Sequence, residues 1–308
     1  MKYTFHTTDV FTDRIFGGNQ LAVLPDARGL SLAQMQAIAA EFNYAESTFV
    51  LPPEDEGQTF RLRIFTPHHE MEFAGHPTVG SALVLAWIGK VPMDGPETEI
   101  VFGENVGPIP VRIEAKGGKA VRAELSARLP EFGPEPPPVA EIAALLGLAE
   151  TDIVVGSGPK EDRPTAVSCG APYLIVTVGS LAALERIEVD PSAWKRSFNG
   201  YWADAVYAIC RETAPEEPGD FRARMFTPGI HDEDAATGSA AAALAGYLSR
   251  LTDLTDGTER RVVHQGVEMG RPSRLDIALD MSRGALTVIR VAGSAVPVAS
   301  GEIEVPDL

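Results

Sequence analysis

The sequence predicts an α+β protein built from two copies of one unit, each a β-sheet wrapped around an apolar helix. Its length of 308 residues suggests roughly two domains of about 150 residues each. Several short segments of the first half recur in the second half in the same order. Two segments, Thr78 to Ile88 and Gly238 to Arg250, are apolar and small nearly all round, as expected of helices enclosed by other elements.

The internal repeat is the most informative of these observations. Ser31 to Ile38 reappears as Ser180 to Ile187, with four of the eight positions identical. Three further pairs keep the same order along the chain: Gly18–Leu24 with Gly170–Val176, Tyr44–Phe49 with Trp202–Tyr207, and Phe65–Ala82 with Phe226–Ala240. On this alignment His76 corresponds to Asp234, Ser81 to Ser239, and Glu46 to Asp204.

The segment Pro130 to Pro138 separates the two copies. It has no apolar period and contains five prolines, which are excluded from helix interiors and central strands. We expect residues 1–129 to form the first repeat, 130–138 a linker, and 139–296 the second repeat.

Within each copy, short β-type runs alternate with a few helices. The predicted strands are Tyr3–Thr7, Gln20–Leu24, Glu46–Leu51, Phe60–Phe65, Val111–Glu114, Tyr173–Val178, Ala205–Cys210, Phe221–Phe226 and Ala285–Val291. The predicted helices are Leu32–Phe42, Thr78–Ile88, Ala140–Leu146, Leu181–Ile187 and Gly238–Arg250. Ser31 and Gln34 form a capping box at the start of the first helix, whose apolar stripe is Leu32, Met35, Ile38, Ala39 and Phe42.

Composition excludes several classes of function. The net charge of −17, with no basic stripe, argues against binding to nucleic acid or to an acidic membrane surface. The longest apolar stretches fall short of the ~18 residues that a membrane span needs. Two cysteines without disulfide or zinc spacing indicate a reducing compartment, and we expect a cytoplasmic protein.

Residues that could carry chemistry gather where the two enclosed helices begin. Glu233 to Ala240 leads into the second helix, and Ala74 to Ala82 leads into the first. Unpaired N–H groups and the positive end of the helix dipole make such starts suitable for an anion. We expect the two starts to face each other across a pseudo-twofold axis and to hold a small carboxylate, with His76 and Asp234 as proton-transfer groups. The binding residues expected there are Gly75, Thr78, Val79, Gly80, Ser81, Thr237, Gly238 and Ser239.

Glu46 is a candidate general base. It lies where a predicted helix ends and a strand begins, among Tyr44, Ala45, Phe49 and Val50. Partial desolvation there would raise its pKa toward the range useful for proton abstraction. The alternative is an exposed loop glutamate, just as Asp234 could be a simple helix N-cap.

Other chemistry is not indicated. The cluster His68 to Glu72 lacks the His-Glu-x-x-His spacing of a helical metal site, so no metal is expected. No glycine-rich phosphate loop occurs, so no nucleotide cofactor is expected. Cys169 is more consistent with a buried inert thiol than with a nucleophile.

Four motifs, in order along almost the whole chain, resemble the PhzF-type isomerase family of phenazine biosynthesis. They are Asp9–Val23, Ala45–Phe49, Phe73–Gly80 and Glu233–Ala240. The family is similar in fold to diaminopimelate epimerase, which implies two repeated domains, each an open β-barrel around a central helix. The resemblance also implies an active site in the cleft between them, no cofactor, a homodimer, and a final strand, 297–308, that returns to the first domain.

Carried over by position, the resemblance implies that Glu46 shuttles the proton while His76, Asp234 and Ser239 position the substrate and assist. The function it implies is a cofactor-independent isomerase that moves a proton between carbons of a small unsaturated or cyclic carboxylate. Related racemases use a cysteine pair at the helix starts, and neither Cys169 nor Cys210 lies there. The alternatives are a non-catalytic protein that binds a small carboxylate, or an epimerase that uses Glu46 and Asp204 as paired bases.

Overall fold

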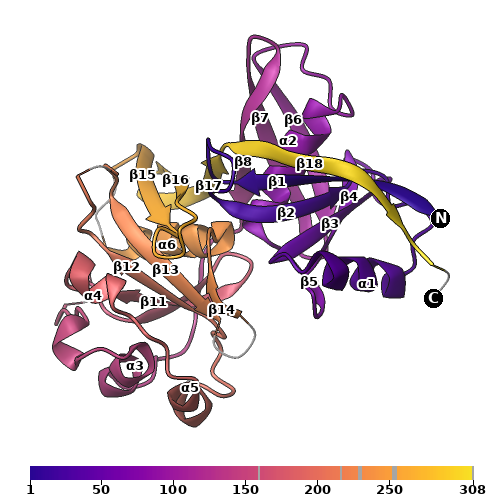
Figure 1. The fold of residues 1–308 in the computed structure, drawn as a ribbon. Helices are drawn as coiled ribbons and strands as arrows, with labels where there is room; N and C mark the ends of the chain where they lie inside the picture. Colours follow the sequence, from indigo (N-terminus) through magenta and orange to yellow (C-terminus); the bar gives the residue numbers. More distant parts are fainter. Residues whose placement is uncertain (159, 216, 228–230, 252–254, 307–308) are drawn as a thin grey trace. The chain divides into compact units, whose positions relative to one another are not determined.

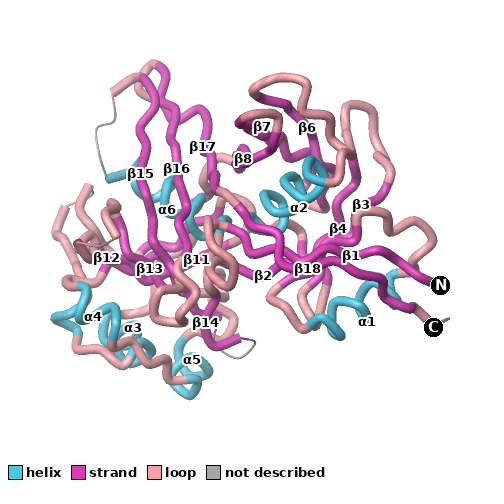
Figure 2. The backbone as a smooth tube through the Cα atoms, turned by 45° about the horizontal axis from the view of Figure 1, so that its top comes forward, coloured by secondary structure: helices cyan, strands magenta, loops and turns pink. Residues whose placement is uncertain are grey.

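The computed structural model describes residues 1–308 except 159, 216, 228–230, 252–254 and 307–308. It is a sheet-dominated α+β structure with few helices (Figure 2). The chain divides into two compact units, residues 1–126 with 291–308 and residues 127–290. The last two residues of the predicted returning strand lie outside the described part. No helix of that part is both long and apolar enough to cross a membrane.

The first unit consists mainly of strands. Its elements are β1 (Lys2–Val10), β2 (Asn19–Leu24), α1 (Leu32–Phe42), β3 (Glu46–Leu51), β4 (Phe60–Phe65), β5 (Glu70–Met71), α2 (Gly75–Trp87), β6 (Glu97–Glu104), β7 (Gly107–Lys116), β8 (Lys119–Ala127) and β18 (Ala295–Glu304). β1 pairs antiparallel with β2 and with β18, so the two ends of the chain lie side by side (Figure 1). β2 runs parallel to β3, and β4 runs parallel to β6.

Helix α2 is enclosed, as its apolar sequence predicts. Every residue from Gly75 to Leu85 is buried, and the helix contacts β1, β2, β3 and β7. A Cβ atom at Gly80 would lie 2.6 Å from side-chain carbons of both Leu21 and Val10. The glycine is therefore what lets the helix lie this close to the sheet.

The second unit repeats the plan. Its elements are β9 (Glu131–Phe132), α3 (Val139–Leu146), η1 (Glu150–Asp152), β10 (Thr165–Ser168), β11 (Pro172–Thr177), α4 (Leu181–Glu185), α5 (Pro191–Ser197), β12 (Val206–Cys210), β13 (Phe221–Thr227), β14 (His231–Asp234), α6 (Gly238–Leu251), β15 (Gly257–Gln265), β16 (Ser273–Ser282) and β17 (Ala285–Gly293). β11 runs parallel to β12, and β13 runs parallel to β15, which matches the parallel pairs of the first unit. Residues Gly238–Leu248 of α6 are buried, and this helix contacts β10, β11 and β16.

The strand registers correct the repeat alignment around Glu46. Ser47 faces Phe65 across β3 and β4, and Val206 faces Phe226 across β12 and β13. Because Phe65 and Phe226 hold matching places in the repeated segment, Ser47 corresponds to Val206 and Glu46 to Ala205. Asp204 is one position away and exposed. The local similarity of Tyr44–Phe49 to Trp202–Tyr207 places Glu46 one residue away from its structural counterpart. The sequence alone could not show this, because the register of a strand is fixed by its pairing with other strands.

Other differences concern element ends. The capping box of Ser31 and Gln34 is confirmed, but Leu32 is 56% exposed and does not belong to the buried stripe. Helix α2 begins at Gly75 rather than at Thr78. Pro77 lies in its first turn, where proline is tolerated because the N–H group that it lacks would have no partner within the helix. The proline-rich segment contains the short strand β9, which pairs with β10.

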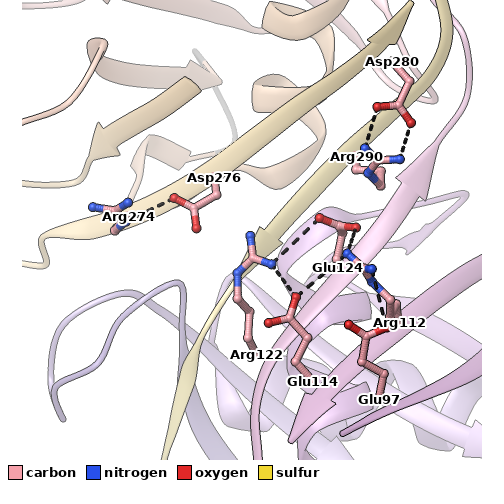
Figure 3. A network of polar contacts seen from close by, with 9 residues as sticks. All are labelled: Glu97, Arg112, Glu114, Arg122, Glu124, Arg274, Asp276, Asp280 and Arg290. Carbon is pink, nitrogen blue, oxygen red and sulfur yellow. Dashed lines mark hydrogen bonds and ion pairs between the residues drawn. The ribbon is translucent and has the colours of Figure 1, made fainter. Parts of the chain in front are cut away.

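Charged side chains cover part of the sheet formed by β6, β7 and β8 (Figure 3). Arg112 donates to Glu124 at 2.7 Å, and Arg122 donates to Glu114 at 2.8 Å. In the second unit, Arg290 donates to Asp280 at 2.6 Å. In both units, opposite charges on neighbouring strands pair in this way, and such cross-strand pairs stabilise a sheet.

Candidate active site

In the first unit, His76 and Glu46 meet at the start of α2. His76 lies in the first turn of the helix and is 3% exposed. Its Nε2 lies 3.1 Å from Oε2 of Glu46, and both side chains are largely buried. Glu46 is the first residue of β3, so a helix start and a strand start bring the two predicted catalytic residues together.

Asn19 determines which nitrogen of His76 carries the proton. Its Nδ2 lies 3.1 Å from Nδ1 of His76. Since an amide nitrogen can only donate, Nδ1 must be the accepting, unprotonated nitrogen. The proton of the neutral imidazole is then on Nε2, the atom that faces the carboxylate of Glu46.

Backbone geometry holds Asn19 and Glu46 in place. Gly18, just before Asn19, has a φ of +60°, and a Cβ there would lie 2.2 Å from the carbonyl oxygen of Val10. Only glycine fits this turn into β2. At the other side, Asn43 ends α1 in the left-handed conformation, which turns the chain into β3 within three residues.

The other predicted residues of α2 are anchored inward. Oγ of Ser81 lies 2.8 Å from Oγ1 of Thr48 on β3. Oγ1 of Thr78 lies 2.7 Å from the carbonyl oxygen of Ala74 and 2.7 Å from Oε1 of Glu104. These hydroxyl groups fix the helix to its sheet, so a ligand at the helix start would meet backbone N–H groups.

In the second unit, Asp234 and Thr237 form the turn that leads into α6. Thr237 donates its hydroxyl proton to Oδ2 of Asp234 at 2.5 Å. Gln265, the last residue of β15, donates to the carbonyl oxygen of Asp234 at 2.8 Å and to Oγ1 of Thr237 at 2.9 Å. The backbone N–H of Thr237 donates in turn to Oε1 of Gln265 at 3.2 Å. One buried carboxamide therefore holds the whole turn.

Two tyrosines lie beside this turn of the second unit. The hydroxyl of Tyr173 lies 2.7 Å from Oγ of Ser239, and Tyr207 donates to Oε1 of Gln265 at 3.2 Å. Burial raises the pKa of Tyr207 above its ordinary value, so this phenol stays protonated and acts as a donor.

The sequence predicts Glu46, His76 and Asp234 as site residues. It does not predict Asn19, Gln265 or Tyr173. Asn19 stands in one of the quoted motifs, whereas Gln265 and Tyr173 stand in none of them. Cys169 is buried as predicted, and burial raises its pKa to about 12. In the cluster His68 to Glu72, Nδ1 of His69 lies 3.2 Å from the hydroxyl oxygen of Thr66. The carboxylate of Glu70 accepts a hydrogen bond from Arg63 at 2.7 Å.

Comparison with known proteins identifies the family. A family model described as "Phenazine biosynthesis-like protein" matches residues 8–301. The chain belongs to the phenazine biosynthesis-like (PhzC-PhzF) family. It is 43% identical over 300 residues to an uncharacterized isomerase of Mesorhizobium japonicum, covering 96% of each chain.

Two further relatives support this assignment. The trans-2,3-dihydro-3-hydroxyanthranilate isomerase of Pseudomonas aeruginosa is 33% identical, over 95% of this chain and 96% of the relative. The crystal structure of a PhzF-family phenazine biosynthesis protein of Bacillus anthracis superposes with a TM-score of 0.86 at 26% identity, over 99% of each chain. The present protein is accordingly an isomerase of the phenazine biosynthesis-like family.

Proposed function

We propose that this isomerase moves a proton between carbons of a small unsaturated or cyclic carboxylate without a cofactor, with Glu46 as the acid/base. The observation that carries the proposal is the 3.1 Å contact between Glu46 Oε2 and His76 Nε2. A carboxylate next to a neutral imidazole, both largely shielded from water, is suited to take a proton and return it.

The proposed cycle conserves charge. Glu46 as carboxylate accepts a proton from one carbon of the substrate, which leaves an electron pair delocalised over the unsaturated system. The resulting carboxylic acid then delivers the proton to a second carbon. His76, held by Asn19 with its proton on Nε2, keeps Glu46 oriented and stabilises its charged form between turnovers.

Substrate binding is assigned to the two helix starts. In the proposal, backbone N–H groups around Gly75, Val79 and Gly80 in α2, and around Gly238 in α6, receive anionic or polar groups of the substrate. Asp234 assists from the second unit, fixed by Thr237 and Gln265. We further propose that residues 1–129 together with 297–308 form one of the two repeated open barrels. Residues 139–296 form the other, and residues 130–138 link them.

Solvent-deuterium incorporation tests the proposal. The probe is trans-2,3-dihydro-3-hydroxyanthranilate, the compound in the name of the Pseudomonas aeruginosa relative. In D₂O the wild-type protein should isomerise it with deuterium at the receiving carbon, and Glu46→Gln should abolish both turnover and incorporation because the amide cannot accept the proton.

Asp204→Asn is the matched control. Asp204 is exposed and one register position away from the counterpart of Glu46, so turnover should be unchanged. Unchanged deuterium incorporation in Glu46→Gln would refute the role of Glu46. Equal loss in both variants would instead indicate an epimerase with paired carboxylates. A small carboxylate that binds the wild type but is recovered chemically unchanged under every condition tried would favour the binding-protein alternative.

A further inference from the structure

Glu104 and Gln265 occupy the same position in the two repeats. Phe60 of β4 pairs with Phe102 of β6, and Phe221 of β13 pairs with Val263 of β15. Since Phe60 and Phe221 begin matching segments, the residues two places after Phe102 and Val263 also match. These residues are Glu104 and Gln265, and each ends its strand.

Both side chains bind a threonine beside an enclosed helix. Gln265 binds Thr237 at the start of α6, and Glu104 binds Thr78 in α2. Gln265 is 0% exposed and Glu104 is 6% exposed. One repeat thus uses a neutral carboxamide where the other uses a carboxyl group.

The two short contacts of Thr78 bear on the protonation state of Glu104. Oγ1 of Thr78 lies 2.7 Å from the carbonyl oxygen of Ala74 and 2.7 Å from Oε1 of Glu104. A hydroxyl group has one proton to donate, and a carbonyl oxygen can only accept. If that proton goes to Ala74, Oε1 of Glu104 must be the donor in the second contact, which requires a protonated carboxyl group.

We propose that Glu104 is a neutral carboxylic acid that donates its proton to Thr78, and that it positions the first turn of α2, with His76 in it, as Gln265 positions the turn before α6. Glu104 is a positioning residue, because it acts on the site through Thr78 and Ala74. Its consequence for catalysis rests on the function proposed above, whereas its protonation state does not.

The surroundings favour the neutral form. Oε2 of Glu104 accepts no hydrogen bond from any described group, and an ionised oxygen in that setting would be costly. Arg61 on β4 is the charged group that acts on Glu104, but in the described part of the chain no cation lies within 4.0 Å of it. The guanidinium of Arg61 is instead bound to the carbonyl oxygens of Leu62 and Gly103 and paired with Glu54. Burial raises the pKa of Glu104 to about 8, outweighing the opposing effects of Thr78 and Arg61.

The sign of the pH dependence follows from this pKa. The folded state binds a proton that the unfolded chain releases near pH ~4.3, so stability is lost as the pH rises from about 4.3 toward 8. Between pH 5 and 8 the unfolding equilibrium constant of wild type should rise roughly 400-fold more than that of Glu104→Gln, which has no proton to lose.

The experiment compares wild type, Glu104→Gln and Glu104→Ala by urea unfolding from pH 5 to 8, and by infrared difference spectroscopy at pH 7. Glu104→Gln should keep the fold, flatten the pH profile and remove one protonated-carboxyl C=O band that shifts in D₂O. Glu104→Ala should be less stable throughout, since Thr78 loses its partner. The reciprocal variant Gln265→Glu should add a steeper pH dependence.

A pH profile unchanged by Glu104→Gln, or the absence of a band lost in that variant, would overturn the proposal. If Glu104→Ala does not fold, wild type and Glu104→Gln still decide the matter. To test positioning, ¹⁵N NMR of the His76 ring should be unchanged in Glu104→Gln and altered in Glu104→Ala, and equal spectra in both would refute that role. None of these measurements needs a substrate, so their failure is distinguishable from failure of the proposed isomerisation.

Discussion

At the scale of single residues, burial keeps the thiol of Cys169 from reacting. Cys169 is 1% exposed, its thiol donates to the carbonyl oxygen of Ala242 in α6 at 3.4 Å, and its pKa is raised to about 12. The nucleophile in thiol chemistry is the thiolate. At pH 8 this thiol is therefore almost entirely protonated as well as inaccessible.

Cys169→Ala should accordingly leave turnover of the probe unchanged, and Cys169 of the folded wild type should resist alkylation by iodoacetamide at pH 8. Peptide mass spectrometry after native and denatured labelling measures this, with labelling under denaturing conditions as the positive control. Since burial raises the pKa of Cys169 to about 12, raising the pH from 7 to 9 should not cause labelling of Cys169 in the folded protein. A Cys169→Ala variant that folds but has no activity would mean that this thiol takes part in the reaction.

The site shows where residue-level prediction from sequence stops. Glu46 and His76 could be predicted because each stands in a short motif beside a helix or strand boundary. Asn19 and Gln265 could not, since they act through contacts set by strand pairing: 57 residues separate Asn19 from His76, and 31 separate Gln265 from Asp234. Asn19 lies on β2 and His76 on α2, whereas Asp234 and Gln265 lie on β14 and β15, which both pair with β13.

At the scale of elements, all-round apolar composition predicted α2 and α6, but it could not predict many of the strands. β16 alternates buried with partly exposed residues and includes Asp276 and Asp280, and several residues of β18 are exposed. Such strands have little local apolar signature, because part of their stabilisation comes from cross-strand pairs such as Arg290 with Asp280.

Gly80 in α2 provides a test of packing against helix propensity. Alanine at a helix-interior position is intrinsically better than glycine by about 1 kcal/mol. A Cβ there would lie 2.6 Å from Leu21 and Val10, and overpacking costs about 1–3 kcal/mol. We expect packing to dominate, so that Gly80→Ala lowers the free energy of unfolding in urea.

The control for this variant is Ala40→Gly in α1, where Ala40 is exposed and only propensity changes. That control should lower the unfolding free energy by about 1 kcal/mol. If Gly80→Ala were instead more stable than wild type, α2 would have room to move away from β1 and β2, and the close approach would not be a constraint.

At the scale of the whole molecule, the chain order makes the first unit discontinuous. The first unit contains residues 1–126 and 291–308, with the entire second unit between them in sequence. β18 pairs with β1 over nine residue pairs, from Lys2 with Glu304 to Val10 with Ala295. The N-terminal amine donates to the carbonyl oxygen of Val305 at 2.8 Å, and Val305 is 4% exposed. The first unit therefore cannot be completed until the last residues of the chain are present.

Deletion of residues 295–308 should consequently affect the two units differently. β1 would keep β2 but lose its other partner strand, β18, and the hydrogen-bonding edge on that side would be open to water. The second unit keeps its own core, which includes Ile142, Leu146 and Leu174. In hydrogen–deuterium exchange, peptides from β1 and β2 should lose protection while peptides from β13 and β16 keep it, because protection follows local unfolding free energies. Equal loss in both units would show that they unfold as one cooperative body, and retained protection of β1 would show that β18 is not needed to stabilise the first unit.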